Sequence, residues 1–251
     1  MEGLKKREQI SEVAEKTIRR VREVFQEKGL RVFLDGSRMR GVSTKESDFD
    51  LKVILDVADN LNKDELLKKF QEHNRIVNET VYKNFPGAKV RDKEMWISFR
   101  DGEGNLFSII PKLSFGGSYE GVFFPNKNKD GFTIDRTISS IKASKEKNRQ
   151  TNGLYKETVI KLKELLLEKY NLTKGGFVVE SLLALVEPNF YLEPENEKER
   201  LKSVIKRVLE IINQENDLPS LGYDVSEDKI FKSDFVRDEA VRMLSGILAD
   251  L

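Results

Sequence analysis

Residues 33–53 read FLDGSRMRGVSTKESDFDLKV, and this stretch decides the fold that we expect for the chain. Its last part has the pattern of a strand in which Asp48 and Asp50 alternate with apolar residues such as Phe49. Side chains two apart on a strand share a face, so both carboxylates are expected on one side of a sheet. Alone, such a pair is most often solvated surface charge. It is also stable where it shares a proton or holds a hard divalent cation such as Mg²⁺ or Mn²⁺.

A glycine and a serine come before the two aspartates. Gly36 and Ser37 follow a short strand and open a predicted short helix or loop, eleven residues before Asp48. Glycine lets the backbone approach a phosphate, and a serine hydroxyl with free N–H groups offers donors to phosphate oxygens. Arg38 and Arg40 either add phosphate contacts or are solvated charges. The turn by itself is equally explained as a strand-to-helix turn with a serine cap, but beside paired carboxylates it predicts a site for metal–triphosphate chemistry.

The composition excludes several kinds of chemistry. The 251 residues include no cysteine and one histidine, which excludes disulfides, thiolate metal sites, a cysteine nucleophile and multi-histidine metal sites. A net charge of +1 argues against general electrostatic attraction to nucleic acid or membrane. We expect no secretory signal and no membrane span, hence a cytoplasmic protein. The single histidine, His73, is expected on a helix surface.

The hydrophobic pattern predicts an α+β domain followed by a helical bundle. The expected strands are 31–34, 49–55, 87–91, 95–100 and 106–110, the last of them ended by Pro111. A loop-rich connection is expected over 116–133. The expected helices are 6–28, 62–84, 136–149, 153–170, 177–186, 197–214 and 234–249. We therefore divide the chain into a core of residues 1–133, which includes the N-terminal helix 6–28, and a helical domain of residues 134–251.

The stretch quoted above resembles the signature of the DNA polymerase β-like nucleotidyltransferase superfamily. The shared features are an apolar strand, Gly-Ser, a short helix and then Ser-Asp-x-Asp-Leu-x-Val, with a small departure at residues 41–44, where Gly-Val-Ser-Thr replaces Gly-Thr. Later segments resemble, in order, those of bacterial CD-NTases and oligoadenylate synthetases; they are 95–111, 159–163, 177–182 and 218–231. The resemblance implies a nucleotidyltransferase mixed-sheet core whose active-site cleft the C-terminal helical bundle completes.

The resemblance also implies roles for particular residues. Asp48 and Asp50 would be catalytic and would hold Mg²⁺ or Mn²⁺. The residues implied to bind the substrate are Gly36, Ser37, Arg38 and Lys163. Ser108 occupies the position of the usual third catalytic carboxylate.

Serine cannot supply the negative charge of that third carboxylate, which leaves three interpretations open. The chain is a weaker enzyme that uses Asp48 and Asp50 with another group, an enzyme rescued by Asp92 or Glu94, or a nucleotide-binding pseudoenzyme. We favour the two enzymatic interpretations together, because an idle site has no stability reason to keep two adjacent aspartates.

The resemblance implies a Mg²⁺-dependent enzyme that joins NTPs into a cyclic or linear oligonucleotide signal and releases pyrophosphate. In bacteria, such an activity would serve antiphage signalling. One alternative is transfer of a nucleoside monophosphate to an RNA end, a protein or a small molecule. Another is a nucleotide- or RNA-binding protein that has lost turnover at Ser108. The expected partners are NTP substrates and an RNA or nucleotide acceptor, with no membrane partner.

Overall fold

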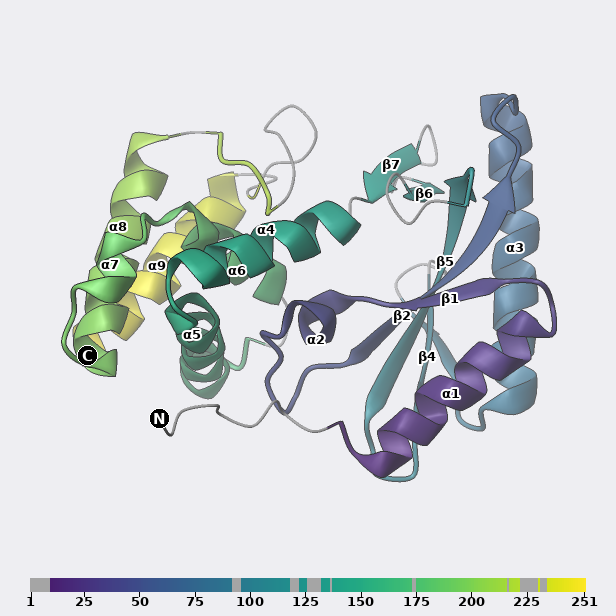
Figure 1. Cartoon of the computed structure of the whole chain (residues 1–251), viewed down its shortest axis with the longest axis horizontal. Coiled ribbons are helices and arrows are strands. Elements are labelled where there is room, and N and C mark those ends of the chain that lie inside the picture. Colours follow the sequence, from purple (N-terminus) through teal and green to yellow (C-terminus); the bar gives the residue numbers. More distant parts are fainter. Residues whose placement is uncertain are drawn as a thin grey trace. The chain divides into compact units, whose positions relative to one another are not determined.

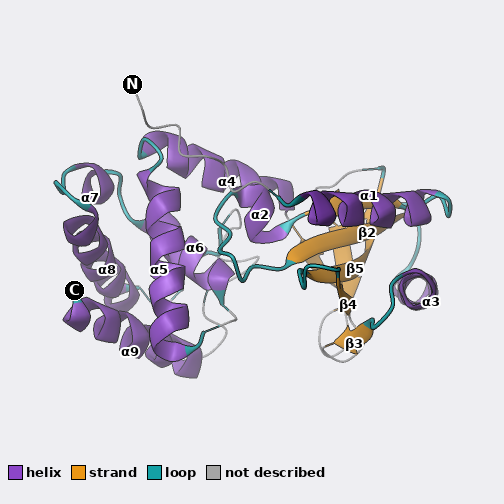
Figure 2. Ribbon diagram, turned by 90° about the horizontal axis from the view of Figure 1, so that it is seen from below, coloured by secondary structure: helices purple, strands orange, loops and turns teal. Residues whose placement is uncertain are grey.

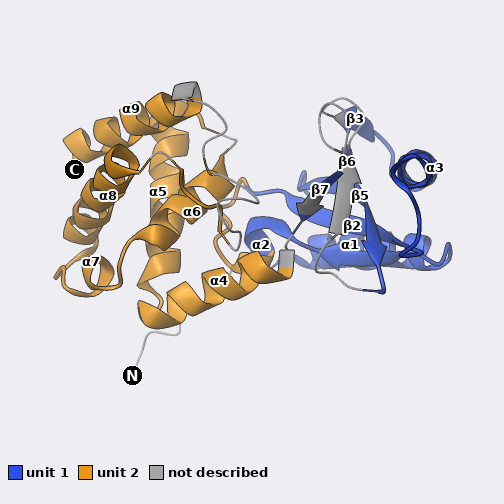
Figure 3. Cartoon of the chain, turned by 90° about the horizontal axis from the view of Figure 1, so that it is seen from above, with its two compact units in different colours: residues 1–38, 47–137 blue, residues 39–46, 138–251 orange. Residues whose placement is uncertain are grey.

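The computed structural model describes residues 10–91, 96–117, 122–125, 132–135, 137–172, 175–215, 217–221, 230 and 234–251. The described strands lie within residues 31–135, and most of the helices follow them along the chain (Figure 1). The chain forms two compact units, one of residues 1–38 and 47–137 and one of residues 39–46 and 138–251 (Figure 3). The second unit therefore includes residues 39–46, which the sequence-based division assigns to the core domain.

The first unit is built on a mixed sheet. Its strands are β1 (Arg31–Leu34), β2 (Phe49–Val57), β3 (Lys89–Arg91), β4 (Trp96–Arg100), β5 (Leu106–Phe115), β6 (Val122–Pro125) and β7 (Phe132–Asp135). Five strands follow the order β1-β2-β5-β4-β3, while β6 pairs with β5 and β7. β2 and β5 are parallel, and the other described pairs are antiparallel. The parallel pair lies inside the sheet and carries Asp50 and Ser108.

Alternation along β2 gives the sheet one apolar face. Phe49, Leu51 and Val53 pack with buried residues of α1 (Glu12–Gln26) and α3 (Lys63–Asn84), which lie beside the sheet (Figure 2). Burial of such side chains contributes roughly 1.5–3 kcal/mol each. This burial fixes the register of β2, because a slip by one residue would turn the aspartates into the core.

Within the described residues, the first helix is shorter than the pattern predicts; residues 6–9 of the expected helix lie outside them. The expected helix over 6–28 begins at Glu12, because Ser11 has extended backbone and its side chain accepts a hydrogen bond from the Ala14 amide. It ends at Gln26, before the left-handed Gly29.

The prediction that Pro111 ends its strand is wrong. β5 continues through Pro111, which lies opposite Val53 of β2. On the other edge of β5, Pro111 lies between Ile109, which pairs with β4, and Leu113, which pairs with β6. A residue without an N–H is tolerated there because the neighbouring strand changes at that point.

The connection over 116–133 is also more regular than expected. It contains β6 and the start of β7, two strands of four residues each. Strands this short carry too few residues for a periodic pattern to show, so the turn residues around them dominate the sequence signal.

His73 is buried, which contradicts the expected surface position. Its side chain in α3 is 0% exposed, and Nε2 donates a hydrogen bond to the Val53 carbonyl oxygen at 2.9 Å. Among the described residues, no group pairs with Nδ1. Burial lowers the pKa of His73, partly opposed by the bond to Val53. The sequence of α3 does not reveal this position, because His73 is a polar residue between Glu72 and Asn74 and yet points toward the sheet.

We expect the chain to lose stability as the pH falls through about 6.5, the ordinary pKa of histidine. Below that value the unfolded chain binds a proton at His73 that the folded chain excludes, a contribution of at most about 1.4 kcal/mol per pH unit. Proton NMR can measure the pKa directly, because the chain has one histidine. Thermal unfolding at pH 7.5 and 5.5 should show a smaller loss for His73→Gln. A measured pKa above 6.5 would contradict the assignment.

The second unit is helical. Its helices are α4 (Thr137–Gln150), α5 (Leu154–Tyr170), α6 (Gly176–Leu185), α7 (Asn189–Leu192), α8 (Glu197–Gln214) and α9 (Asp234–Asp250). All but the four-residue α7 were predicted, with ends within one residue. Together with the mixed sheet, these helices confirm the α+β prediction. None of the described helices has both the length and the apolar character that a membrane span requires.

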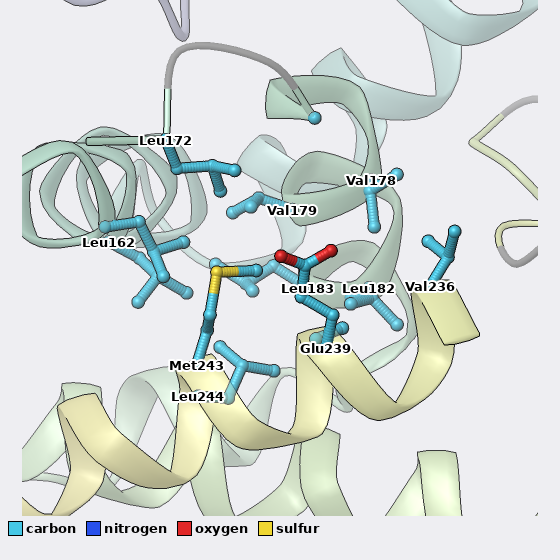
Figure 4. A pocket seen from close by; sticks show the side chains of 13 residues that line it. Leu162, Leu172, Val178, Val179, Leu182, Leu183, Val236, Glu239, Met243 and Leu244 are labelled. Atoms are coloured by element: carbon cyan, nitrogen blue, oxygen red, sulfur yellow. The ribbon is translucent and has the colours of Figure 1, made fainter. Parts of the chain in front are cut away.

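The core of this unit lies where α5, α6, α8 and α9 meet. Between α5, α6 and α9 lies a partly open, mostly apolar cavity of about 210 Å³, whose walls include Leu162, Val179 and Met243 (Figure 4). Where α5 and α6 meet, they also bring together two charged residues described below, Lys163 and Glu180.

Candidate functional site

The turn after β1 lies against the start of β2. The two strands are antiparallel, and the Asp35 amide donates to the Asp50 carbonyl oxygen at 2.8 Å. Gly36 then begins the short helix α2 (Gly36–Arg40) with a φ of +72°. Strand pairing thus brings the predicted Gly36–Ser37 turn beside Asp50.

Two features require glycine at position 36. Its φ lies in the left-handed region, where L side chains are strained. A Cβ built on Gly36 would also lie 2.1 Å from Asp50 Oδ2. The carboxylate of Asp50 therefore packs directly on the backbone of the turn, with the half-buried Ser37 next in the chain.

Gly36→Ala is expected to lower stability and to disturb Asp50, whereas Gly87→Ala should lower stability alone. Both glycines have a left-handed φ, and alanine there costs about 1–2 kcal/mol. Only at Gly36 would the new methyl group displace a carboxylate, since no described atom lies within 4 Å of a Cβ at Gly87. Thermal unfolding and nucleotide binding of both variants check this. Equal binding by the two variants would contradict it.

Ser108 lies on the same face as the two aspartates. It is directly opposite Asp50 on the parallel strand β5, and its hydroxyl donates to Asp48 Oδ2 at 2.9 Å. Its side chain is buried. The structure therefore brings Asp48, Asp50, Ser108 and Gly36 together.

Asp48, Asp50 and Ser108 together supply two carboxylates and one hydroxyl. Within the described residues, no group of three or more acidic, histidine or cysteine side chains could hold a metal. Asp92 and Glu94, the acids suggested as replacements, lie outside the described residues. Oxygen donors on Asp48 and Asp50 beside a tight glycine turn fit Mg²⁺ or Mn²⁺ in kind, but with less negative charge than three carboxylates would supply.

Arg38 stabilises the entry to β2. Its Nη2 donates to the Ser47 carbonyl oxygen at 2.6 Å, and its guanidinium lies 3.9 Å from the centre of the Phe49 ring. Arg38 is therefore more than a solvated charge on the short helix. A phosphate contact by Arg38 stays a prediction.

A buried charge network on the same face of the sheet was missed in the sequence. Lys52 Nζ lies 2.5 Å from Asp35 Oδ2 and 2.6 Å from Asp135 Oδ2. Lys112 Nζ lies 3.3 Å from the same oxygen of Asp135. Burial lowers the pKa of Lys112 to about 8, with Asp135 opposing the shift and Lys52 adding to it.

This network links the turn to the strand. Asp35 directly precedes Gly36, and Lys52 follows Asp50 by two residues on β2, so their ion pair joins the two parts of the site. Alternation places Lys52 on the face of Asp50, and this is the signal that could have revealed it.

Lys163 and Arg40 lie in the second unit, where both contact the Glu180 carboxylate. Lys163 Nζ is 2.7 Å from Glu180 Oε1 and donates to the Val42 carbonyl oxygen at 3.0 Å. Arg40 Nε is 2.5 Å from Glu180 Oε2. Arg40 is buried, so of the two alternatives for it the solvated charge is wrong. Burial lowers the pKa of Lys163, opposed by Glu180.

Known proteins resemble this chain in part of its sequence and in its fold. Residues 15–91, which contain most of α1, the glycine turn and the two aspartates, match the family described as the nucleotidyltransferase domain. No curated protein matches the chain in sequence.

Solved structures match most of the chain. The CdnE cyclic dinucleotide synthase of Elizabethkingia meningoseptica, solved with GTP and Apcpp, has a TM-score of 0.70 and 20% identity over 92% of this chain and 89% of that one. The CdnE c-UMP-AMP synthase of Rhodothermus marinus, solved with Apcpp and Upnpp, has a TM-score of 0.66 and 17% identity, covering 94% and 92%. The STING-associated CdnE c-di-GMP synthase of Capnocytophaga granulosa has a TM-score of 0.70 and 17% identity, covering 94% and 80%. At these identities the likeness establishes the fold.

Proposed function

We propose that this chain is a metal-dependent enzyme of the cytoplasm that joins NTPs into a cyclic or linear oligonucleotide signal. The proposal is based on the match of residues 15–91 to the nucleotidyltransferase domain family and on a fold that is similar to that of the CD-NTases. Pyrophosphate is the second product, and antiphage signalling is the proposed role. The observation that carries the proposal is the contact between Gly36 and Asp50 on the face that also holds Asp48. The solved structures with bound nucleotides and analogues support NTPs as the substrates.

Asp48 and Asp50 would hold Mg²⁺ or Mn²⁺. When bound there, the ion supplies positive charge that neutralises and orients the triphosphate. Because the Asp50 carboxylate packs on Gly36, charge at the strand and donors at the turn lie within one small region. Burial of Phe49, Leu51 and Val53 on the opposite face fixes the register of β2 and so holds the carboxylates in place.

The turn and one lysine would hold the triphosphate. The Ser37 hydroxyl is proposed to donate to a terminal phosphate oxygen, and the glycine backbone lets that phosphate approach. Lys163 is proposed to add a point charge. Its ammonium has three N–H donors, of which Glu180 and Val42 accept two in the described contacts.

The reaction would be an in-line displacement at the α-phosphorus. The acceptor hydroxyl oxygen forms the new bond, the bond from the α-phosphorus to the bridging oxygen breaks, and pyrophosphate leaves with that oxygen. The hydroxyl proton passes to solvent, because Ser108 has no carboxylate to receive it. We therefore expect slow turnover.

Ser108 also favours a second candidate function, a nucleotide-binding protein without turnover. Its hydroxyl donates to Asp48, so a neutral group occupies the position opposite Asp50 where the family usually has an acid. Such a protein would bind metal and NTP but would release no pyrophosphate.

Incubation of the purified chain with labelled NTPs and Mg²⁺ or Mn²⁺ tests these functions. Labelled oligonucleotide with pyrophosphate release supports the proposal. Label on added RNA or protein alone would indicate transfer to a different acceptor. Nucleotide binding without pyrophosphate release would identify the binding protein.

A further inference from the structure

We propose that Glu180 is a positioning residue for the nucleotide site and acts through residues 39–46, which we call the strap. This inference rests on the proposed function, because the quantity that Glu180 controls is the affinity for an NTP. The strap separates the glycine turn from the aspartates along the chain, yet it belongs to the second unit with Glu180.

The strap is held by a buried carboxylate shared between two cations. Glu180 is 0% exposed. Its two oxygens contact Arg40 Nε at 2.5 Å and Lys163 Nζ at 2.7 Å. Lys163 also donates to the Val42 carbonyl oxygen at 3.0 Å. One strap side chain and one strap carbonyl group thus depend, directly or through Lys163, on this carboxylate.

Glu180 itself is fixed by the packing of α5 against α6. The Tyr155 hydroxyl of α5 donates to the Glu180 carbonyl oxygen at 3.0 Å. Leu162 and Val179, the neighbours of Lys163 and Glu180 in sequence, both line the apolar cavity between these helices (Figure 4). The hydrogen bond from Tyr155 therefore ties the backbone of Glu180 to α5, and the carboxylate holds the strap from that position.

Both ends of the strap continue directly into the proposed nucleotide site. Ser37 and Arg40 lie three residues apart in the single helix α2. At the other end, Ser47 follows the strap and precedes Asp48. A displacement of the strap would therefore pull on the phosphate-binding turn and on the metal-binding strand together.

Removing the charge of Glu180 should release the strap. The variant Glu180→Gln keeps the size of the side chain but leaves Arg40 and Lys163 without this carboxylate, which is destabilising for buried cations. A matched control is Val208→Ala, which removes buried apolar volume from α8 in the same unit, a helix that carries none of these groups. Glu180→Asp keeps the charge on a shorter side chain, so it should show a smaller change in strap exchange and in nucleotide affinity than Glu180→Gln.

The experiment combines backbone amide exchange over 39–46 with titration of non-hydrolysable analogues of ATP, GTP, CTP and UTP in the presence of Mg²⁺. For Glu180→Gln we expect faster exchange in the strap and a Kd raised about tenfold. Val208→Ala should lower the thermal stability without either change. A Kd for Glu180→Gln equal to that of the unmodified chain, or the same rise in Val208→Ala, overturns the inference. Absence of binding by the unmodified chain instead overturns the proposed function, and the inference with it.

Discussion

Replacing Asp48 and Asp50 together by alanine is expected to reduce NTP turnover at least about a thousandfold, which is roughly 4 kcal/mol of transition-state stabilisation. These are the two carboxylates of the described site, and the described residues offer no larger acidic cluster to replace them. The fold should survive, because the change relieves repulsion between like charges and leaves the apolar face of β2 intact. Pyrophosphate release and thermal unfolding measure the two effects.

Asp56→Ala is the matched control for this double variant. Asp56 lies on the same strand, is partly exposed and pairs with Arg31 at 2.6 Å. It should lose little stability, since exposed ion pairs contribute at most about 1 kcal/mol, and it should keep its turnover. A large drop in the unfolding temperature of the double variant would mean that Asp48 and Asp50 are structural. An equal loss of turnover in Asp56→Ala would contradict a specific role for Asp48 and Asp50 in the reaction.

Ser108→Asp is expected to raise turnover at least about tenfold, since a well-placed carboxylate can act as a general base. The Ser108 hydroxyl lies 2.9 Å from Asp48 Oδ2 and opposite Asp50, so a new carboxylate would join the existing pair. Without metal, the third charge should lower thermal stability through repulsion. Added Mg²⁺ should therefore raise the unfolding temperature of this variant more than that of the unmodified chain.

The neutral variant Ser108→Asn separates charge from size. It has nearly the shape of aspartate but supplies no negative charge, so it should gain neither turnover nor the added response to Mg²⁺. Unchanged or lower turnover in Ser108→Asp would show that the missing carboxylate does not limit the reaction. That outcome favours the nucleotide-binding protein without turnover.

The sequence predicts those parts of the structure that depend on local periodicity. Long amphipathic helices such as α8 begin and end as expected, because many residues share one pattern and Asn196 caps the start. Alternation along β2 places Asp48 and Asp50 on one face, and the structure has them on the face of Ser108. The neighbourhood of Gly36 and Asp50 follows from the pairing of β1 with β2, two strands that are close in sequence.

Features that depend on distant partners could not be predicted. Arg40 is buried because Glu180, 140 residues later, supplies a carboxylate for it. His73 is buried because its helix packs on the sheet and Val53 offers a carbonyl group. Pro111 remains within a strand because the neighbouring strand changes beside it. No local pattern records these contacts.

The central claim is that the glycine turn and the two aspartates form one site for a metal and a triphosphate. Anomalous diffraction from a crystal grown with Mn²⁺ and a non-hydrolysable NTP analogue tests it most directly. The account predicts a Mn²⁺ peak between the Asp48 and Asp50 carboxylates, with the triphosphate reaching Gly36 and Ser37. A metal and nucleotide bound elsewhere, with these four residues contacting neither, would contradict it.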